Sequence, residues 1–140
     1  MKTISYLSIL ILFAMQSYAQ SENKVDLTLE FEATEFGGGS ILFALFNSED
    51  SHMENNYKAA SSSFKDGKTK IVIENLPKGF YSFSYYHDVN SNGELDKNMV
   101  GIPKEPYGFS NGQKGNFGQP NFQESKIEIK IDTVIQLKIK

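Results

Sequence analysis

Cysteine, tryptophan and arginine are all absent from this sequence of 140 residues. Without cysteine the chain has neither a disulfide nor a cysteine for lipid attachment, so its fold depends on a hydrophobic core, with a bound metal ion as the remaining aid. Without arginine it lacks the planar guanidinium group that usually clamps phosphates and carboxylates. The formal net charge is −3. Nucleic-acid binding relies on a cationic face, so we expect no nucleic-acid partner.

Long hydrophobic runs are also missing, apart from one near the N-terminus. Lys2 precedes a short apolar stretch, residues 4–15, and small residues follow at Ser17 and Ala19. This order is typical of a cleavable export signal, and the stretch is shorter than the roughly 20 apolar residues of a membrane span. We therefore expect a signal peptide over residues 1–19, cleaved after Ala19, no membrane-spanning segment, and a periplasmic or extracellular protein.

The remaining residues, 20–140, are enough for one domain with a single core. Residues 24–33 alternate apolar and polar side chains, which is the period of a strand with one face in solvent. Further segments typical of strands cover residues 41–46, 57–64, 69–73 and 80–88, and no window has a helical period. The sequence predicts an all-β fold, an antiparallel β-sandwich of about seven strands, immunoglobulin-like or transthyretin-like.

Two segments complete this outline. Residues 89–121 are rich in Asn, Gly and Pro, which predicts one long ordered loop with at most short strands, and a loop of this length normally has a functional or ligand-held explanation. Near the C-terminus, isoleucine or leucine occupies the odd-numbered positions 127, 129, 131, 135, 137 and 139. A two-residue hairpin turn would put them on opposite faces, so we expect one long bent strand or a hairpin with a three-residue turn.

The start of the long loop carries an oxygen-bearing side chain at every second position. These residues are Asp88, Asn90, Asn92, Glu94 and Asp96, with Gly93 at the sixth position. A chain that curls round a cation points alternate side chains inward, and Ca²⁺ takes about six to eight oxygen ligands. Met99 stands where an EF-hand has its bidentate glutamate, which excludes an EF-hand. The spacing predicts a Ca²⁺ loop of another kind, in which Glu94 offers its backbone carbonyl; a metal-free turn rich in Asp and Asn is the alternative.

No catalytic residue can be assigned from the sequence. Residues 108–112 match the G-x-S-x-G pattern of serine hydrolases, but no helix follows Ser110 to form the strained elbow which that chemistry needs. The two histidines are His52, in a polar connection, and His87, on the aromatic face of a strand where a structural role is expected. No Ser–His pair is evident and two histidines argue against a zinc site. We therefore favour a protein that is not an enzyme.

Aromatic residues are spread through the same long loop. Tyr107, Phe109 and Phe117 would form a stacking platform for sugars or peptides if their rings were exposed. If the rings were buried, they would anchor the loop onto the end of the sandwich, which is the safer interpretation because exposed aromatic patches promote aggregation.

Several runs of the sequence resemble a known family. The longest is residues 87–111, HDVNSNGELDKNMVGIPKEPYGFSN, and the others are ILFALFN at 41–47, NLPKGFY at 75–81 and GNFGQPNF at 115–122. Together they are similar to the signature of a bacterial family known as domain of unknown function 2141. The resemblance implies an exported β-sandwich without assigned activity, and it supplies no catalytic residues.

Three functions follow as alternatives. The first is an exported, non-enzymatic structural or binding module whose loop at residues 88–96 binds Ca²⁺. The second is a module that binds a cell-surface glycan, a protein or a peptide through the loop aromatics. The third and least favoured is a hydrolase built on Asp88, Asp96, Glu105 and Ser110, which requires at least two of these side chains to converge in a pocket.

Overall fold

Eight strands make up most of this computed structural model, which describes residues 23–35, 37–112 and 118–140. They are β1 (Lys24–Ala33), β2 (Ser40–Phe46), β3 (Lys58–Ser63), β4 (Lys68–Pro77), β5 (Gly79–Asp88), β6 (Tyr107–Phe109), β7 (Ile127–Ile129) and β8 (Thr133–Ile139). A 3₁₀ turn, η1 (Ser110–Gly112), and one helical turn, α2 (Phe122–Ser125), complete the described elements. None of the described residues belongs to a helix that is long and apolar enough to cross a membrane. The expected signal peptide, residues 1–19, lies outside the described residues.

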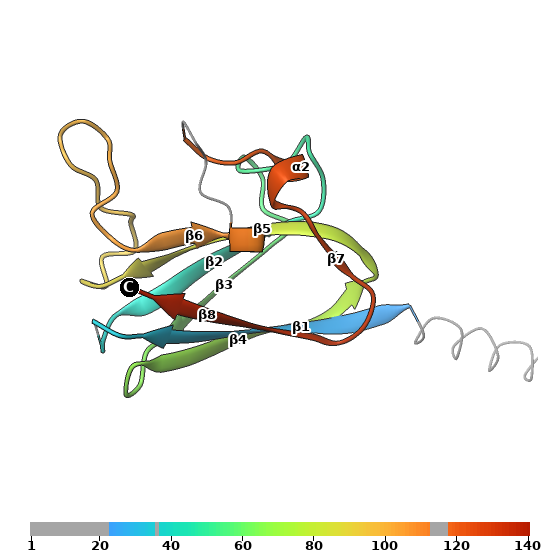
Figure 1. The fold of residues 1–140 in the computed structure, drawn as a ribbon, viewed down its shortest axis with the longest axis horizontal. Helices are drawn as coiled ribbons and strands as arrows, with labels where there is room; N and C mark the ends of the chain where they lie inside the picture. Colours follow the sequence, from blue (N-terminus) through green and yellow to red (C-terminus); the bar gives the residue numbers. More distant parts are fainter. Residues whose placement is uncertain (1–22, 36, 113–117) are drawn as a thin grey trace, which may run out of the picture.

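The strands form two sheets that pack face to face (Figure 1). One sheet has the order β4-β1-β8 and the other β3-β2-β5-β6, while β7 pairs with β5 outside that path. The described pairs of named strands are antiparallel, apart from β1 and β8, which run parallel. The predicted all-β, antiparallel β-sandwich is confirmed, with eight strands where about seven were expected.

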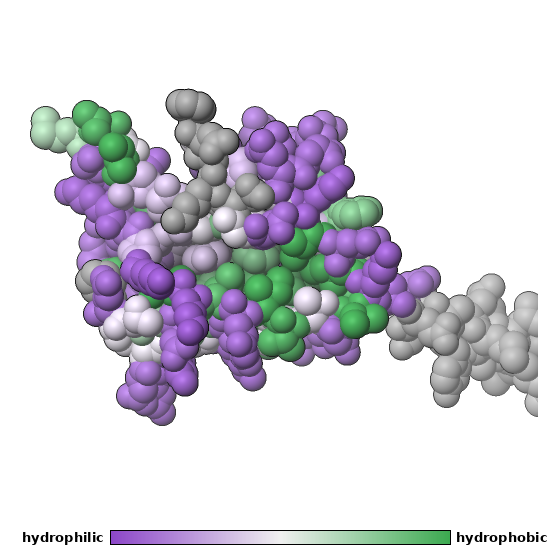
Figure 2. All heavy atoms as spheres, in the orientation of Figure 1, coloured by the Kyte–Doolittle hydropathy of each residue, from purple (hydrophilic) through white to green (hydrophobic). Residues whose placement is uncertain are grey.

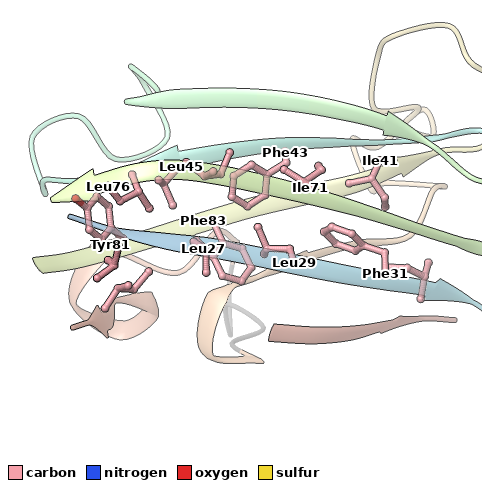
Figure 3. Packing of buried hydrophobic residues seen from close by; sticks show 14 residues of the cluster. Leu27, Leu29, Phe31, Ile41, Phe43, Leu45, Ile71, Leu76, Tyr81 and Phe83 are labelled. Carbon is pink, nitrogen blue, oxygen red and sulfur yellow. The ribbon is translucent and has the colours of Figure 1, made fainter. Parts of the chain in front are cut away.

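A single hydrophobic core lies between the sheets (Figure 3). Its side chains come from alternate positions of several strands, among them Leu27, Leu29, Phe31, Ile41, Phe43, Leu45 and Phe83. Complete burial of one such side chain contributes roughly 1.5–3 kcal/mol to the free energy of unfolding. The other face of β1 carries Glu30 and Glu32, which are exposed. The alternation that predicted this strand therefore reflects one face in the core and one in solvent.

The C-terminal apolar segment is divided between the two sheets. The chain turns within three residues, 130–132, but β7 and β8 do not pair with each other: β7 pairs with β5, and β8 pairs with β1. Ile129 and Ile139 therefore enter the core from opposite sheets, whereas Ile131, at the crossing, is exposed. This differs from both a hairpin and one continuous bent strand, because each half of the segment completes a different sheet.

The glycine run before β2 is held against the end of β5. His87 Nε2 donates a hydrogen bond to the carbonyl oxygen of Gly38 at 2.6 Å, and its buried ring packs on Phe64 with centroids 4.5 Å apart. Gly39 has φ +79°, and a Cβ there would lie only 2.3 Å from the carbonyl oxygen of Asp88. His87 thus has a structural role, and Gly39 is required both by its backbone angle and by the close approach of β5.

Candidate functional site

The long loop leaves β5 at Asp88, projects beyond the end of the sandwich and returns to the same sheet as β6 (Figure 1). Its two arms run side by side: Lys97 and Pro103 form a β-bridge, and the backbone N–H of Lys104 donates to the carbonyl of Asp96 at 2.8 Å. The predicted ordered loop is therefore present in the described residues, with one short strand, β6, inside the predicted range.

Asp88 holds the first turn of this loop. Its side chain is only 2% exposed, because it folds back under the turn that follows. Oδ1 accepts the backbone N–H of Asn92 at 3.1 Å, and Oδ2 accepts that of Gly93 at 2.8 Å. Ser91 and Gly93 both have positive φ, +60° and +81°, so the chain curls tightly round the carboxylate. Glycine at position 93 adopts this angle without the cost that a Cβ would add.

The other predicted ligand residues converge on the same turn. Asn90 Nδ2 donates to Asp96 Oδ2 at 2.7 Å, and Asn92 Nδ2 donates to Asp96 Oδ1 at 3.1 Å. Asn90 Oδ1 accepts the backbone N–H of Asn92 at 3.1 Å. Three of the five predicted residues thus meet through their side chains, and a fourth, Asp88, joins them through the backbone N–H groups of Asn92 and Gly93. The fifth, Glu94, takes part through its backbone N–H, which donates to Asn92 Oδ1 at 2.9 Å, while the residue itself is exposed.

Glu105 is a central member of this network, although the alternating pattern does not include it. Its side chain is 8% exposed. Oε1 accepts the backbone N–H of Val89 at 2.9 Å and Oε2 that of Asp96 at 3.1 Å, so one carboxylate ties both ends of the turn together. No local pattern in the sequence indicates this role, because Glu105 lies nine positions beyond Asp96, where the alternation ends.

Tyr86 closes the network from the sheet. Its phenol oxygen donates a hydrogen bond to the carbonyl of Gly93 at 2.9 Å. Burial raises the pKa of this phenol above its ordinary value of 10.0, and the negative charges of Asp88, Glu105 and Glu94 raise the pKa further. The site is therefore a turn rich in carboxylate oxygens, with a neutral tyrosine as a hydrogen-bond donor beside it.

The oxygen atoms of this turn are already engaged in hydrogen bonds. No group of three His, Cys, Asp or Glu side chains that could hold a metal occurs in the described residues. Each carboxylate oxygen of Asp88 and Glu105 accepts a backbone N–H, and each carboxylate oxygen of Asp96 accepts a side-chain amide. A cation would therefore have to share these oxygens with N–H donors and recruit amide or backbone oxygens as further ligands.

A groove of about 400 Å³ lies between the loop and β6. Its lining includes Tyr86, Leu95, Lys97, Pro103, Tyr107, Phe109 and Gln119. Of the three predicted ligand contacts, Tyr107 is 52% exposed beside the groove, whereas Phe109 is buried with its ring 5.9 Å from that of Tyr107. Phe117 lies outside the described residues. The structure thus offers one exposed ring with a buried ring behind it rather than an open row.

Tyr85 explains why a glycine occupies the middle of β6. A Cβ at Gly108 would lie 2.4 Å from the Tyr85 hydroxyl oxygen and 2.5 Å from Cζ, so the tyrosine ring lies directly across the strand. The same ring packs edge to face on Phe31, with centroids 5.2 Å apart. Gly108 therefore fixes the position of β6, and with it the side of the groove that Tyr107 forms.

Comparison with known proteins adds one match to this geometry. A family model described as "Uncharacterized protein conserved in bacteria (DUF2141)" matches residues 30–136, which is most of the chain. The chain belongs to the DUF2141 family. The resemblance expected from the sequence is thereby confirmed, and the match runs from within β1 to within β8 and includes the whole loop. No curated protein and no solved structure is significantly similar to the chain.

Ser110 of this DUF2141 chain has a structural role. The residue is completely buried, its Oγ accepts the backbone N–H of Phe83 at 2.9 Å, and it donates to the carbonyl of Ser125 at 2.6 Å. It thereby connects β5 with α2. A buried hydroxyl engaged in this way has no access to a substrate, so the G-x-S-x-G match at residues 108–112 reflects packing.

A Ser–His pair does exist, contrary to expectation, between Ser82 and His52. Ser82 Oγ lies 2.9 Å from His52 Nδ1, and His52 Nε2 donates to the carbonyl of Pro120 at 2.9 Å. The histidine ring lies between the rings of Phe46 and Phe122, at centroid distances of 5.2 and 5.8 Å. Ser82 is completely buried. This DUF2141 chain thus uses the pair to hold the connection after β2 and the segment before α2 against β5, and sequence spacing gives no signal for it.

Three of the four residues of the hydrolase alternative meet in the loop network, namely Asp88, Asp96 and Glu105, while Ser110 lies apart in the sandwich. The carboxylates of Asp88 and Glu105 are buried and hold backbone N–H groups in place. A general acid or base must reach a bound substrate, and these oxygens are directed into the turn.

Proposed function

We propose that this DUF2141 chain is an exported binding module without catalytic activity, which takes a small carbohydrate in the groove beside Tyr107. The observation that carries the proposal is the 52% exposure of the Tyr107 ring at the edge of a groove of about 400 Å³. An apolar groove with a few polar side chains is the usual form of a small-ligand site. An export signal at residues 1–19 would bring the module to glycans outside the cytoplasm.

The composition of the groove favours a sugar over an apolar ligand. Tyr107 offers a ring face on which the C–H groups of a pyranose can stack, and Lys97 and Gln119 offer polar groups for its hydroxyls. Buried Phe109 supports the exposed ring edge to face, which restrains Tyr107 before a ligand arrives. A restrained contact residue loses less conformational entropy on binding, which raises affinity.

The proposal is tested by isothermal titration with soluble chito-, cello-, malto- and xylo-oligosaccharides. We expect at least one oligosaccharide to bind. Tyr107→Ala should raise its Kd about tenfold, the usual scale of one aromatic contact. Tyr57→Ala is the matched control, because Tyr57 is an exposed tyrosine that does not line the groove. No binding of any of these oligosaccharides would contradict the ligand class, and equal affinity of the wild type and Tyr107→Ala would contradict the site.

A second proposal concerns the loop that forms the other wall of the groove. The loop binds Ca²⁺ through oxygens of Asp88, Asn90 and Asp96, and the ion orders the loop. The burial of Asp88 and Glu105 supports this proposal, because neither carboxylate takes part in the ion pairs found among the described residues, Lys68–Glu32 and Lys130–Glu128. Backbone N–H groups are the partners of both carboxylates, no lysine neutralises their charge in those ion pairs, and Ca²⁺ prefers oxygen ligands. The test is thermal unfolding in EDTA and in millimolar Ca²⁺.

A further inference from the structure

The far end of the projecting loop carries three exposed apolar side chains within four residues. Met99, Val100 and Ile102 are 105%, 78% and 59% exposed, and we call them the apolar tip. Figure 2 shows hydrophobic atoms at the outer end of the loop that Figure 1 draws projecting from the sandwich. Clustered apolar exposure of this kind marks an interaction site in soluble proteins, whereas single exposed apolar residues are ordinary.

The backbone beneath the apolar tip is held in one conformation. Asn98 Oδ1 accepts the N–H of Val100 at 3.0 Å and that of Ile102 at 2.9 Å, and the Asn98 N–H donates to the carbonyl of Ile102 at 2.8 Å. Gly101 has φ +83°, and its N–H donates to the Asn98 carbonyl at 3.0 Å. The tip is therefore presented on a closed turn, and little backbone entropy is lost when it binds.

The charges next to the apolar tip are positive. Lys97 and Lys104 lie at the two sides of its base, both exposed, and they are the only charged residues between positions 97 and 104. The acidic residues next to them, Asp96 and Glu105, accept hydrogen bonds within the turn at the base of the loop, in a chain whose formal net charge is −3. A convex apolar turn flanked by ammonium groups matches a lipid surface, because the apolar side chains can reach the acyl boundary while lysines meet the phosphates.

We propose that the apolar tip inserts into the interface of an anionic phospholipid bilayer, with Lys97 and Lys104 against the lipid phosphates. The contact is peripheral, since three side chains and two cations give reversible rather than permanent attachment. It lies at the outer end of the wall that the loop contributes to the groove.

The absence of tryptophan from the chain allows a direct test. Val100→Trp places the only tryptophan at the tip, and Val134→Trp places it at an exposed valine of β8 as the matched control. Both are made in the full sequence, so their N-terminal segments are identical. With vesicles of equal parts phosphatidylglycerol and phosphatidylcholine, we expect a blue shift of Val100→Trp fluorescence, quenched by brominated acyl chains, and no shift for Val134→Trp.

Charge and tip variants separate this proposal from its alternatives. Loss of both lysines in Lys97→Gln/Lys104→Gln should weaken vesicle partitioning roughly tenfold or more, whereas Lys65→Gln/Lys78→Gln, two exposed lysines elsewhere, should leave it unchanged. No blue shift of Val100→Trp, or equal shifts of both tryptophans, would overturn the proposal. It would also be overturned if sedimentation velocity without lipid revealed a dimer that Met99→Ser/Ile102→Ser abolishes, because the tip would then bind a second copy of the chain.

Discussion

Glu105 accepts the backbone N–H of Asp96 at 3.1 Å across nine positions of the chain. The same carboxylate accepts the N–H of Val89 at 2.9 Å, so it fixes both ends of the turn that Asp88 organises from within. These two carboxylates give the loop its shape, and the loop in turn supplies one wall of the groove and presents the apolar tip.

Removing the Glu105 side chain should destabilise the protein. Glu105→Ala leaves the N–H groups of Val89 and Asp96 without their acceptor, and unsatisfied buried donors cost about 1–3 kcal/mol each. Partial access of water lowers this cost, so we expect the free energy of unfolding in urea to fall by about 2–4 kcal/mol. Glu94→Ala, at an exposed carboxylate of the same loop, should change it by less than about 0.5 kcal/mol. Equal effects of the two substitutions would contradict the assigned role.

Gly108→Ala should displace Tyr85 and loosen β6. The added Cβ would lie within 2.5 Å of the Tyr85 ring, and overpacking of this kind typically costs about 1–3 kcal/mol. Gly37→Ala is the matched control, since a Cβ at Gly37 has no atom within 4 Å. Chemical denaturation of both variants measures the difference. If Gly108→Ala were as stable as Gly37→Ala, the tyrosine ring would not constrain the strand.

The sequence predicted the sandwich because its main strands bury one face. Leu27, Leu29 and Phe31 alternate with polar residues for that reason. Asp88 and Asp96 lie in one turn, where both accept hydrogen bonds from Asn92. The alternation of apolar residues does not, however, indicate which sheet a strand joins. It therefore could not separate β7 from β8, since Ile129 and Ile139 reach the same core from opposite sheets.

Two features of the site could not be predicted from the sequence for a similar reason. Tyr107 and Phe109 lie on the same face of β6, and only the packing around them exposes one ring and buries the other. Ser82 and His52 lie thirty positions apart, and no local pattern relates them. Contacts between distant segments depend on the assembled sheets, whereas alternation depends only on the strand itself.

Calcium should raise the thermal stability if the second proposal holds. At a Ca²⁺ concentration about 100 times the Kd, binding adds roughly 2.7 kcal/mol, and the melting temperature should rise by several degrees relative to EDTA. Asp88→Ala and Asp96→Ala should remove the shift, and Mg²⁺ should give a smaller one because it dehydrates reluctantly. Identical melting temperatures of the wild type in EDTA and in Ca²⁺ would contradict Ca²⁺ binding by the loop.

Alkaline pH should weaken the fold through Tyr85. Burial raises the pKa of this phenol above 10.0, so the folded state favours the neutral form. The resulting stability is complete below the unfolded pKa and is lost as the pH rises through the folded pKa. The free energy of unfolding should therefore fall as the pH rises above the ordinary tyrosine pKa of 10.0, and fall less in Tyr85→Phe. An equally steep decline of the unfolding free energy in Tyr85→Phe would show that groups other than Tyr85 cause it.

A ligand in the groove between the loop and β6 should be visible in an NMR titration of ¹⁵N-labelled protein with the oligosaccharide that binds most tightly. We predict shifts of backbone amide signals in residues 84–86, 95–103 and 107–109, and their disappearance in Tyr107→Ala. Shifts confined to other parts of the sandwich, or none with any oligosaccharide of the panel, would contradict binding in the groove.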